Sequence, residues 1–142
     1  MVDRDPFDLE RFVAAQSGVI ERVRAELQSG RKQSHWMWFV FPQLAGLGFS
    51  PMAQRYAIAS LDEARAYLAH HLLGARLREC TELVLAIHGK TAHEIFGSPD
   101  DLKLRSCVTL FAYVSEAGSI FHRVLDRFYD GIPDPRTLER LR

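Results

Sequence analysis

The stretch Ser34-His-Trp-Met-Trp-Phe-Val-Phe-Pro-Gln43 holds both tryptophans of the chain, two of its nine phenylalanines and one of its six histidines. Aromatic rings dominate the energetics of cores and pockets, and a buried indole N–H needs a hydrogen-bond partner. The stretch is therefore predicted to be the centre of the core, the wall of a ligand cleft, or both. With Ser34 as its N-cap it would form a short helix, although a buried strand also fits so short an apolar run.

Residues that cap helices recur on both sides of this stretch. Four dipeptides place Asp or Ser before a proline that suits the first helical position, namely Asp5-Pro6, Ser50-Pro51, Ser98-Pro99 and Asp134-Pro135. Two segments have the spacing of a capping box, Ser60-Leu-Asp-Glu63 and Thr91-Ala-His-Glu94. Alternating strand patterns are almost absent. The capping pattern predicts a single multihelical domain of the all-α class over residues 1–142, with central buried helices.

Apolar stripes between these starts predict about seven to nine helices. A short turn is expected at 92–96, short helices are expected at 51–57 and 61–69, and further helices are expected at 7–29, 71–88, 99–115, 119–128 and 135–141. Gly18 weakens the first of these, so two shorter helices are an alternative there. Segment 99–115 is apolar on most sides after an acidic first turn, which is typical of a central, buried helix.

Composition narrows the classes of function. Hydrophobic residues make up 47% and charged residues 25% of the 142 residues, as in soluble globular proteins. The 18 basic residues balance the 18 acidic ones, which disfavours nucleic acid and anionic membranes as partners. No run approaches the roughly 18 apolar residues of a membrane span, and the acidic N-terminus does not resemble a signal peptide. A cytoplasmic protein is expected, and the sequence carries no signal of oligomeric state.

Cysteine and histidine spacing predicts neither a metal nor a cofactor. Cys80 and Cys107 lie in apolar helical stretches without C-x-x-C spacing, which favours buried free thiols over a disulfide, a zinc site or a nucleophile. His70-His71 and Glu79 lack the His-x-x-x-His spacing of a metal site. The glycine patterns of P-loop, dinucleotide and hydrolase sites are also missing from the sequence.

The aromatic run supplies the first candidate site residues. His35 could donate to an anion at a helix start or carry a proton, since its unperturbed pKa is near 6.5. The faces of Trp36 and Trp38 could stack on a planar or cationic ligand. In a helix, Trp38 shares its face with Phe39 and Pro42, which predicts that Trp38 points toward the interior.

A second group of candidates lies in the segment 97–109. Lys103 and Ser106 share one face of an otherwise apolar helix, where polar groups need partners. A lysine in a dry wall pairs with a carboxylate or presents its charge to a ligand. Asp101 suits the first turn of a helix and is spaced for an ion pair with Arg105.

A glycine-containing loop and the segment after it complete the set. Gln43 begins the loop that contains Gly46 and Gly48, and Arg55 and Tyr56 follow it. An arginine fork recognises carboxylate or phosphate well.

The sequence resembles the domain of unknown function 1810 family, uncharacterised bacterial proteins often mislabelled "calpastatin", over nearly its whole length. The resemblance rests chiefly on Gly30-Arg-Lys-x-Ser-His-Trp-Met-Trp-Phe-Val-Phe-Pro-Gln43, Gly46-Leu-Gly48 and Ile95-Phe-Gly-Ser-Pro-Asp-Asp-Leu-Lys103. It implies a multihelical fold whose central helices are buried by the others. It implies no reaction, ligand or cofactor.

These residues support two hypotheses of function. In the first, a cleft binds a small anionic or nucleotide-like ligand; in an enzyme, His35 would carry the proton, Asp101 would orient it, and Lys103 and Arg55 would hold the anion. In the second, the protein is a non-catalytic interaction or regulatory module, whose aromatic residues form core and whose polar residues cap helices. A deep cleft lined by His35, Arg55 and Lys103 would favour the first.

Overall fold

The computed structural model describes residues 4–141, which contain ten helices and no β-strand. The all-α class is confirmed, with slightly more helices than expected. Their bounds are α1 (Glu10–Ser17), α2 (Ile20–Gln28), α3 (Met37–Val40), α4 (Pro51–Arg55), α5 (Leu61–Ala69), α6 (Leu73–Leu85), α7 (Ala92–Phe96), α8 (Asp100–Tyr113), α9 (Ile120–Phe128) and α10 (Pro135–Leu141).

Short polar side chains cap half of the ten described helices. A side-chain oxygen accepts a hydrogen bond from the amide three residues further on at α4, α5, α7 and α9, where the N-caps are Ser50, Ser60, Thr91 and Ser119. The capping box at Thr91 is complete, because the Glu94 carboxylate accepts from the Thr91 amide in return. Residues 92–96 are consequently a helix where a turn was expected.

In the first hundred residues, one stated alternative is confirmed and two predicted caps are wrong. The first long helix is divided at Gly18 into α1 and α2, as the alternative prediction held. Helix α3 starts after Trp36 without a side-chain cap, so Ser34 is not its N-cap, and the strand alternative for this run is wrong. Helix α8 follows Pro99, again without a side-chain cap, so Ser98 does not cap it.

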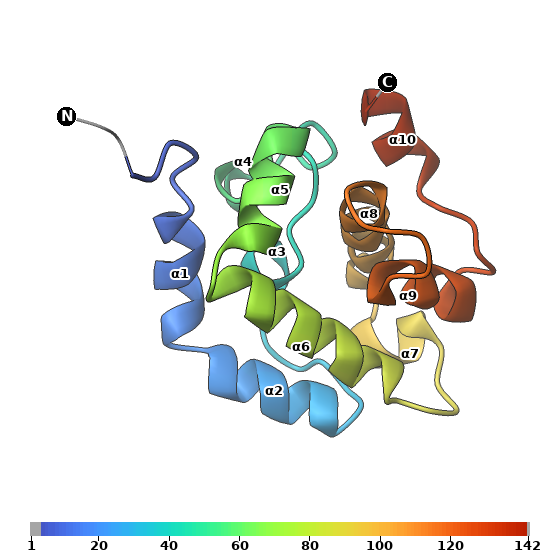
Figure 1. Ribbon diagram of the computed structural model, residues 1–142. Coiled ribbons are helices and arrows are strands. Elements are labelled where there is room, and N and C mark those ends of the chain that lie inside the picture. Colours follow the sequence, from blue (N-terminus) through green and yellow to red (C-terminus); the bar gives the residue numbers. More distant parts are fainter. Residues whose placement is uncertain (1–3, 142) are drawn as a thin grey trace.

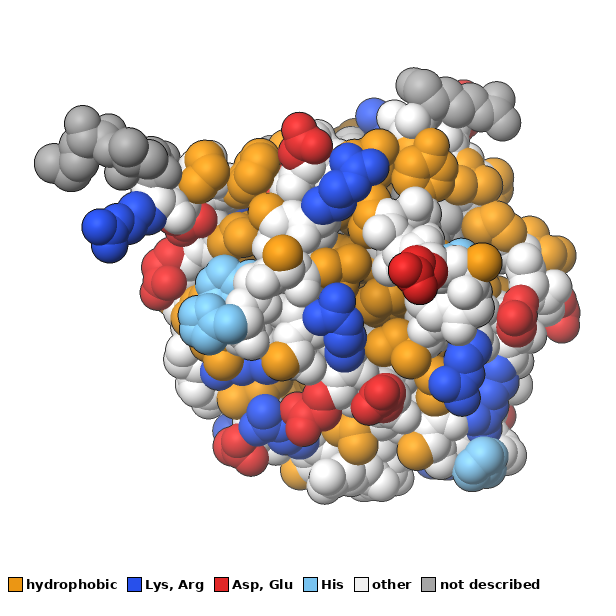
Figure 2. Space-filling view, in the orientation of Figure 1, with side chains coloured by type: hydrophobic (Ala, Val, Ile, Leu, Met, Phe, Trp, Pro, Cys, Tyr) orange, Lys and Arg blue, Asp and Glu red, His pale blue; other side chains and the backbone are white. Residues whose placement is uncertain are grey.

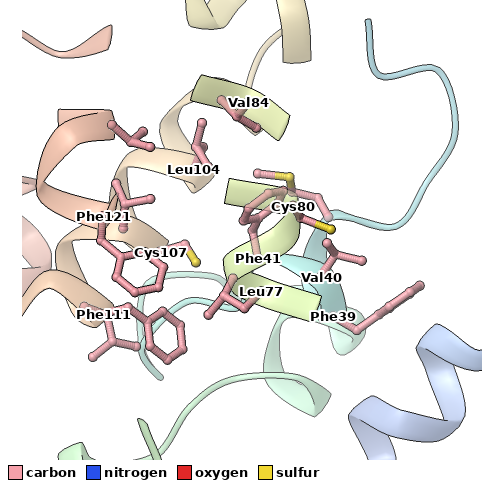
Figure 3. Packing of buried hydrophobic residues seen from close by; sticks show 14 of the residues in the cluster. Phe39, Val40, Phe41, Leu77, Cys80, Val84, Leu104, Cys107, Phe111 and Phe121 are labelled. Atoms are coloured by element: carbon pink, nitrogen blue, oxygen red, sulfur yellow. The ribbon is translucent and has the colours of Figure 1, made fainter. Parts of the chain in front are cut away.

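Helices α6 and α8 occupy the middle of the molecule. Helix α8 packs against α5, α7, α9 and α10, while α6 packs against α2, α5 and α9 (Figure 1). Side chains from α3, α6, α8 and α9 meet in one hydrophobic cluster (Figure 3). Almost every residue of α8 from Leu104 to Ala112 is buried, which confirms the predicted central helix.

The surface carries charges of both signs. Figure 2 shows acidic and basic side chains interspersed over the face that it displays, as the equal numbers of acidic and basic residues suggest. Within residues 4–141, every helix falls short of the length and apolar character that crossing a membrane would require.

Candidate functional site

The loop between α2 and α3 is held by the carboxylate of Glu26, which is only 8% exposed. Its Oε1 accepts hydrogen bonds from the amides of Gln33 (2.7 Å) and Ser34 (3.0 Å) and from the Trp36 indole Nε1 (3.0 Å). The Ser34 hydroxyl donates to Oε2. Burial alone would raise the pKa of Glu26, but these hydrogen bonds outweigh it and lower the pKa to about 2. The carboxylate is therefore ionised at neutral pH and orders the loop.

Two lysines next to this loop share a single carboxylate. Asp100 Oδ2 lies 2.8 Å from Lys32 Nζ, and Asp100 Oδ1 lies 3.6 Å from Lys103 Nζ. The side chains of Lys32, Asp100 and Lys103 are 7%, 19% and 22% exposed. Each ammonium also lies over an indole, Lys32 at 5.0 Å from the Trp36 ring centroid and Lys103 at 5.2 Å from that of Trp38. The trio has one positive charge in excess in a largely desolvated setting.

The excess charge adjoins a groove of about 510 Å³ that Lys103 lines. The lining comes from three parts of the chain, within residues 43–53, 99–106 and 134–136. In Figure 1 these are the loop before α4 with α4 itself, the first half of α8, and the start of α10. Its charged residues are three cations, Lys103, Arg105 and Arg136, and one carboxylate, Asp134. The groove is thus electropositive in a protein whose formal net charge is zero.

Most polar groups at the groove have partners inside the protein. The Asp134 carboxylate accepts from the Ser106 hydroxyl (3.2 Å) and from the Thr137 amide (3.0 Å), where it caps α10 as predicted. The guanidinium of Arg105 donates to two backbone carbonyls just before Asp134. The Arg136 side chain is exposed and has no ion pair or hydrogen bond within residues 4–141. Arg136 and Lys103 are therefore the cations available to an anion.

Three of the sequence-predicted site residues line the groove together: Gln43, Lys103 and Ser106. Trp38 is half-buried and contributes through its contact with Lys103. The other tryptophan, Trp36, is 1% exposed and belongs to the core. Trp38 packs against the core only in part, so the prediction that it points toward the interior holds less well than expected. Trp36 is the fully buried ring, because α3 begins at Met37 and helical phase does not extend back to Trp36.

The remaining candidates do not line the groove. Tyr56 is 6% exposed and packs in the core against Phe39, with ring centroids 5.4 Å apart. The Arg55 side chain is exposed, with its guanidinium carbon 5.5 Å from the Tyr56 ring centroid. His35 is exposed and has no side-chain hydrogen bond or ion pair within residues 4–141. Of the four residues proposed for catalysis or anion binding in an enzyme, only Lys103 lines the groove.

Asp101 faces a different neighbour from the one expected. Its Oδ2 lies 3.4 Å from Nδ1 of His93, and its Oδ1 accepts from the Leu102 amide. The predicted ion pair with Arg105 does not form, because the Arg105 guanidinium is turned to backbone carbonyls of the segment that leads to α10.

Sequence reasoning missed several residues that line the groove. Asp134 was recognised as a cap, but nothing in its spacing places α10 beside α8. Arg136 and Phe49 carry no local signal, since a surface arginine and a loop phenylalanine are ordinary in any sequence. The pair of lysines around Asp100 could have been suspected, because both belong to the segments that carry the family resemblance.

The two thiols are unsuited to chemistry at neutral pH. Cys80 and Cys107 are both free and fully buried, as predicted. Burial raises the pKa of Cys80 to about 12 and that of Cys107 well above its ordinary value. A thiol needs to ionise before it attacks or binds a metal, so neither is activated. In the described part of the chain, no three side chains among His, Cys, Asp and Glu gather as a metal site requires.

Two other hollows compare poorly with the groove as anion sites. One of about 640 Å³ lies between α5, α6 and the loop before α9, and its charges balance, with two arginines and two glutamates: Arg65, Arg78, Glu82 and Glu116. The other, of about 370 Å³, is formed by α8, α9 and α10, is lined mainly by apolar residues, and contains neither lysine nor arginine.

Comparison with known proteins identifies the family. Residues 6–141 match the family described as "Protein of unknown function (DUF1810)", and the chain belongs to it. The crystal structure of the conserved hypothetical protein Rv1873 from Mycobacterium tuberculosis is similar, with a TM-score of 0.95 and 58% sequence identity over 96% of this chain and 98% of that chain. None of the curated proteins matches. The comparisons confirm the resemblance and the fold, and they assign no ligand.

Proposed function

We propose that this member of the DUF1810 family binds a small anionic ligand in the groove between α4, α8 and α10. The observation that carries the proposal is the shared carboxylate of Asp100, which leaves one of two partly buried lysines without full compensation. Uncompensated charge in a poorly hydrated place is costly, and an anion in the groove would lower that cost. Lys103 lines the groove, so its ammonium is the expected contact.

The arrangement suits a carboxylate, a sulfonate or a phosphate. Lys103 offers a compact charge, and the exposed guanidinium of Arg136 offers a fork for bidentate hydrogen bonds. The groove's volume of about 510 Å³ falls in the range of small-molecule sites. Nucleotides belong to this class of ligand. The proposal concerns binding, and we assign no reaction to the site.

The alternative of a non-catalytic interaction module is favoured by a different observation. The polar groups of residues 26–36 hold the loop between α2 and α3 together, as that hypothesis expected. The two proposals differ in what they require of the groove, because only ligand binding needs Lys103 to remain cationic.

Thermal unfolding with inorganic phosphate as the probe tests the proposal. Phosphate at constant ionic strength should raise the Tm of the wild-type protein, since a ligand of the folded state stabilises it by mass action. Lys103→Ala should weaken the apparent affinity at least about tenfold, the loss expected for one charge-assisted hydrogen bond.

Lys90→Ala is the matched control, because Lys90 is an exposed lysine outside the groove whose Nζ donates to the Gly30 carbonyl. It should retain the phosphate response. Equal responses of the two variants, or no response in the wild type, would contradict the proposal and favour the interaction module.

A further inference from the structure

We infer that the anion bound in the groove is attached to an apolar aromatic ring, as in an aryl carboxylate, sulfonate or phosphate. The inference rests on the proposed function and narrows its class of ligand. The evidence for the ring is a pair of exposed hydrophobic side chains. Phe49 is 76% exposed and Leu102 is 58% exposed, the highest values among the large hydrophobic residues described, and both line the groove.

The two side chains come from different elements and line the same groove as Lys103 and Arg136. Leu102 lies in the first turn of α8, directly before Lys103. Phe49 lies in the loop that leads into α4, directly before the cap Ser50. Large exposed apolar side chains that line a hollow typically mark a place where a ligand or partner is bound. Here they adjoin available cations, so an amphipathic anion satisfies both features.

The backbone at Phe49 is anchored. The Phe49 carbonyl accepts from the Gln54 side-chain amide at 2.9 Å, and the Ser50 hydroxyl accepts from the Ala53 amide at 3.1 Å. A Cβ added at Gly48 would lie 2.7 Å from the Cβ of Ala53, so the loop sits directly against α4. The aromatic ring therefore projects from an anchored backbone, so contact with a flat ligand requires little further loss of backbone entropy.

The apolar surfaces of Phe49 and Leu102 favour an apolar ring over a nucleobase. Both side chains are largely exposed and line the groove. A base placed against them would bring its donors and acceptors to two hydrocarbon surfaces, which offer no hydrogen-bond partner. A hydrocarbon ring loses no hydrogen bonds there and gains the contact with Phe49 and Leu102.

Three probes distinguish these possibilities when their affinities are measured by calorimetric titration: inorganic phosphate, 1-naphthyl phosphate and adenosine monophosphate. The wild-type protein should bind 1-naphthyl phosphate at least about tenfold more tightly than inorganic phosphate, and more tightly than the nucleotide. Phe49→Ala should remove most of this preference while leaving the affinity for inorganic phosphate unchanged. Leu102→Ala tests the same contact from the other element.

Tyr113→Ala is the control, because Tyr113 is 52% exposed but lines a different hollow; it should keep the full preference. Equal affinities for 1-naphthyl phosphate and inorganic phosphate, or tighter binding of the nucleotide, would overturn the aromatic inference and leave the proposed function intact. No binding of any probe would instead overturn the proposed function. A preference that survives both Phe49→Ala and Leu102→Ala would show that the ring binds elsewhere.

Discussion

The loop at residues 30–36 and the groove lined by residues 43–53, 99–106 and 134–136 are both polar, yet they use their polar atoms differently. In the loop, Glu26 receives four hydrogen bonds and Lys32 is paired with Asp100. In the groove, Lys103 shares the Asp100 carboxylate with Lys32, and Arg136 is unpaired within the described residues. The distinctive polar residues of the loop therefore serve structure, while the cations available to a ligand lie beside it, in the groove.

The two tryptophans give the largest expected contrast. Trp36→Ala removes a ring that is 1% exposed, along with a donor to Glu26, and should lower the free energy of unfolding by about 3–5 kcal/mol. Trp38→Ala removes a half-buried ring and should cost about 1–2 kcal/mol. Urea unfolding of both variants measures the difference. If the two variants lost equal free energy of unfolding, Trp36 would contribute no more to stability than the half-buried Trp38, against the structural role given to the loop.

Acid unfolding isolates the contribution of Glu26. Its pKa is about 2 in the folded protein against an ordinary value of 4.5. A lowered pKa stabilises the fold above the unfolded value, so this contribution, about 3 kcal/mol, is present above pH 4.5 and is lost as the pH falls toward 2. Glu26→Gln should be less stable at pH 7 and should show a flatter dependence across that window.

The exposed Glu116→Gln variant provides the comparison for that experiment, since its carboxylate has no partner within the described residues. Its stability should follow the wild-type pH profile when unfolding is measured at a series of pH values. A Glu26→Gln profile that is parallel to the wild type between pH 4.5 and pH 2 would contradict the role given to this carboxylate.

The lysines on Asp100 should separate stability from binding. Lys32→Met removes the closer partner of Asp100 and should lower the free energy of unfolding by about 2 kcal/mol. Lys103→Met removes the more distant and more exposed one and should cost less than about 1 kcal/mol. Chemical unfolding with and without phosphate reports both properties. Lys103→Met should lose the phosphate response, and Lys32→Met should only weaken it, because Asp100 then compensates Lys103 alone. If Lys103→Met caused the larger loss of stability and Lys32→Met the larger loss of phosphate binding, the roles given to the loop and the groove would be wrong.

The smallest expected effect is that of His35→Ala. The side chain is exposed and lies outside the groove, so the free energy of unfolding should change by less than about 0.5 kcal/mol. Phosphate affinity, measured by the same titration, should be unchanged. A variant that folds normally but loses phosphate binding would restore His35 as a ligand-binding residue and would count against the groove.

Much of the fold could be predicted from the sequence because helix starts are local. Ser50, Ser60 and Thr91 cap as their spacing indicates, and the apolar stretch of α8 is buried as predicted. The boundaries around α3 were harder to predict, because Ser34 donates to a side chain eight residues earlier instead of capping the next helix. A hydrogen bond to an acceptor as distant in sequence as Glu26 cannot be predicted from the residues around Ser34.

The candidate site could be predicted only in part. Lys103 and Ser106 share a helical face and do line the groove, since periodicity within one helix is readable from sequence. Their grouping with His35 and Arg55 depended on how separate helices pack, and that packing places Asp134 and Arg136 beside them instead. Arrangement between elements is set by the whole core, so it required the structure.

Whether an anion binds in the groove is tested by a titration with inorganic phosphate, followed through the backbone amide resonances of the protein. We expect the resonances that move with phosphate to belong to residues 47–53, 100–106 and 136–137, around the groove. Those of residues 31–37 should stay in place, because the loop is already held by Glu26. Shifts centred on His35 and Arg55, with the groove unchanged, would contradict anion binding in the groove.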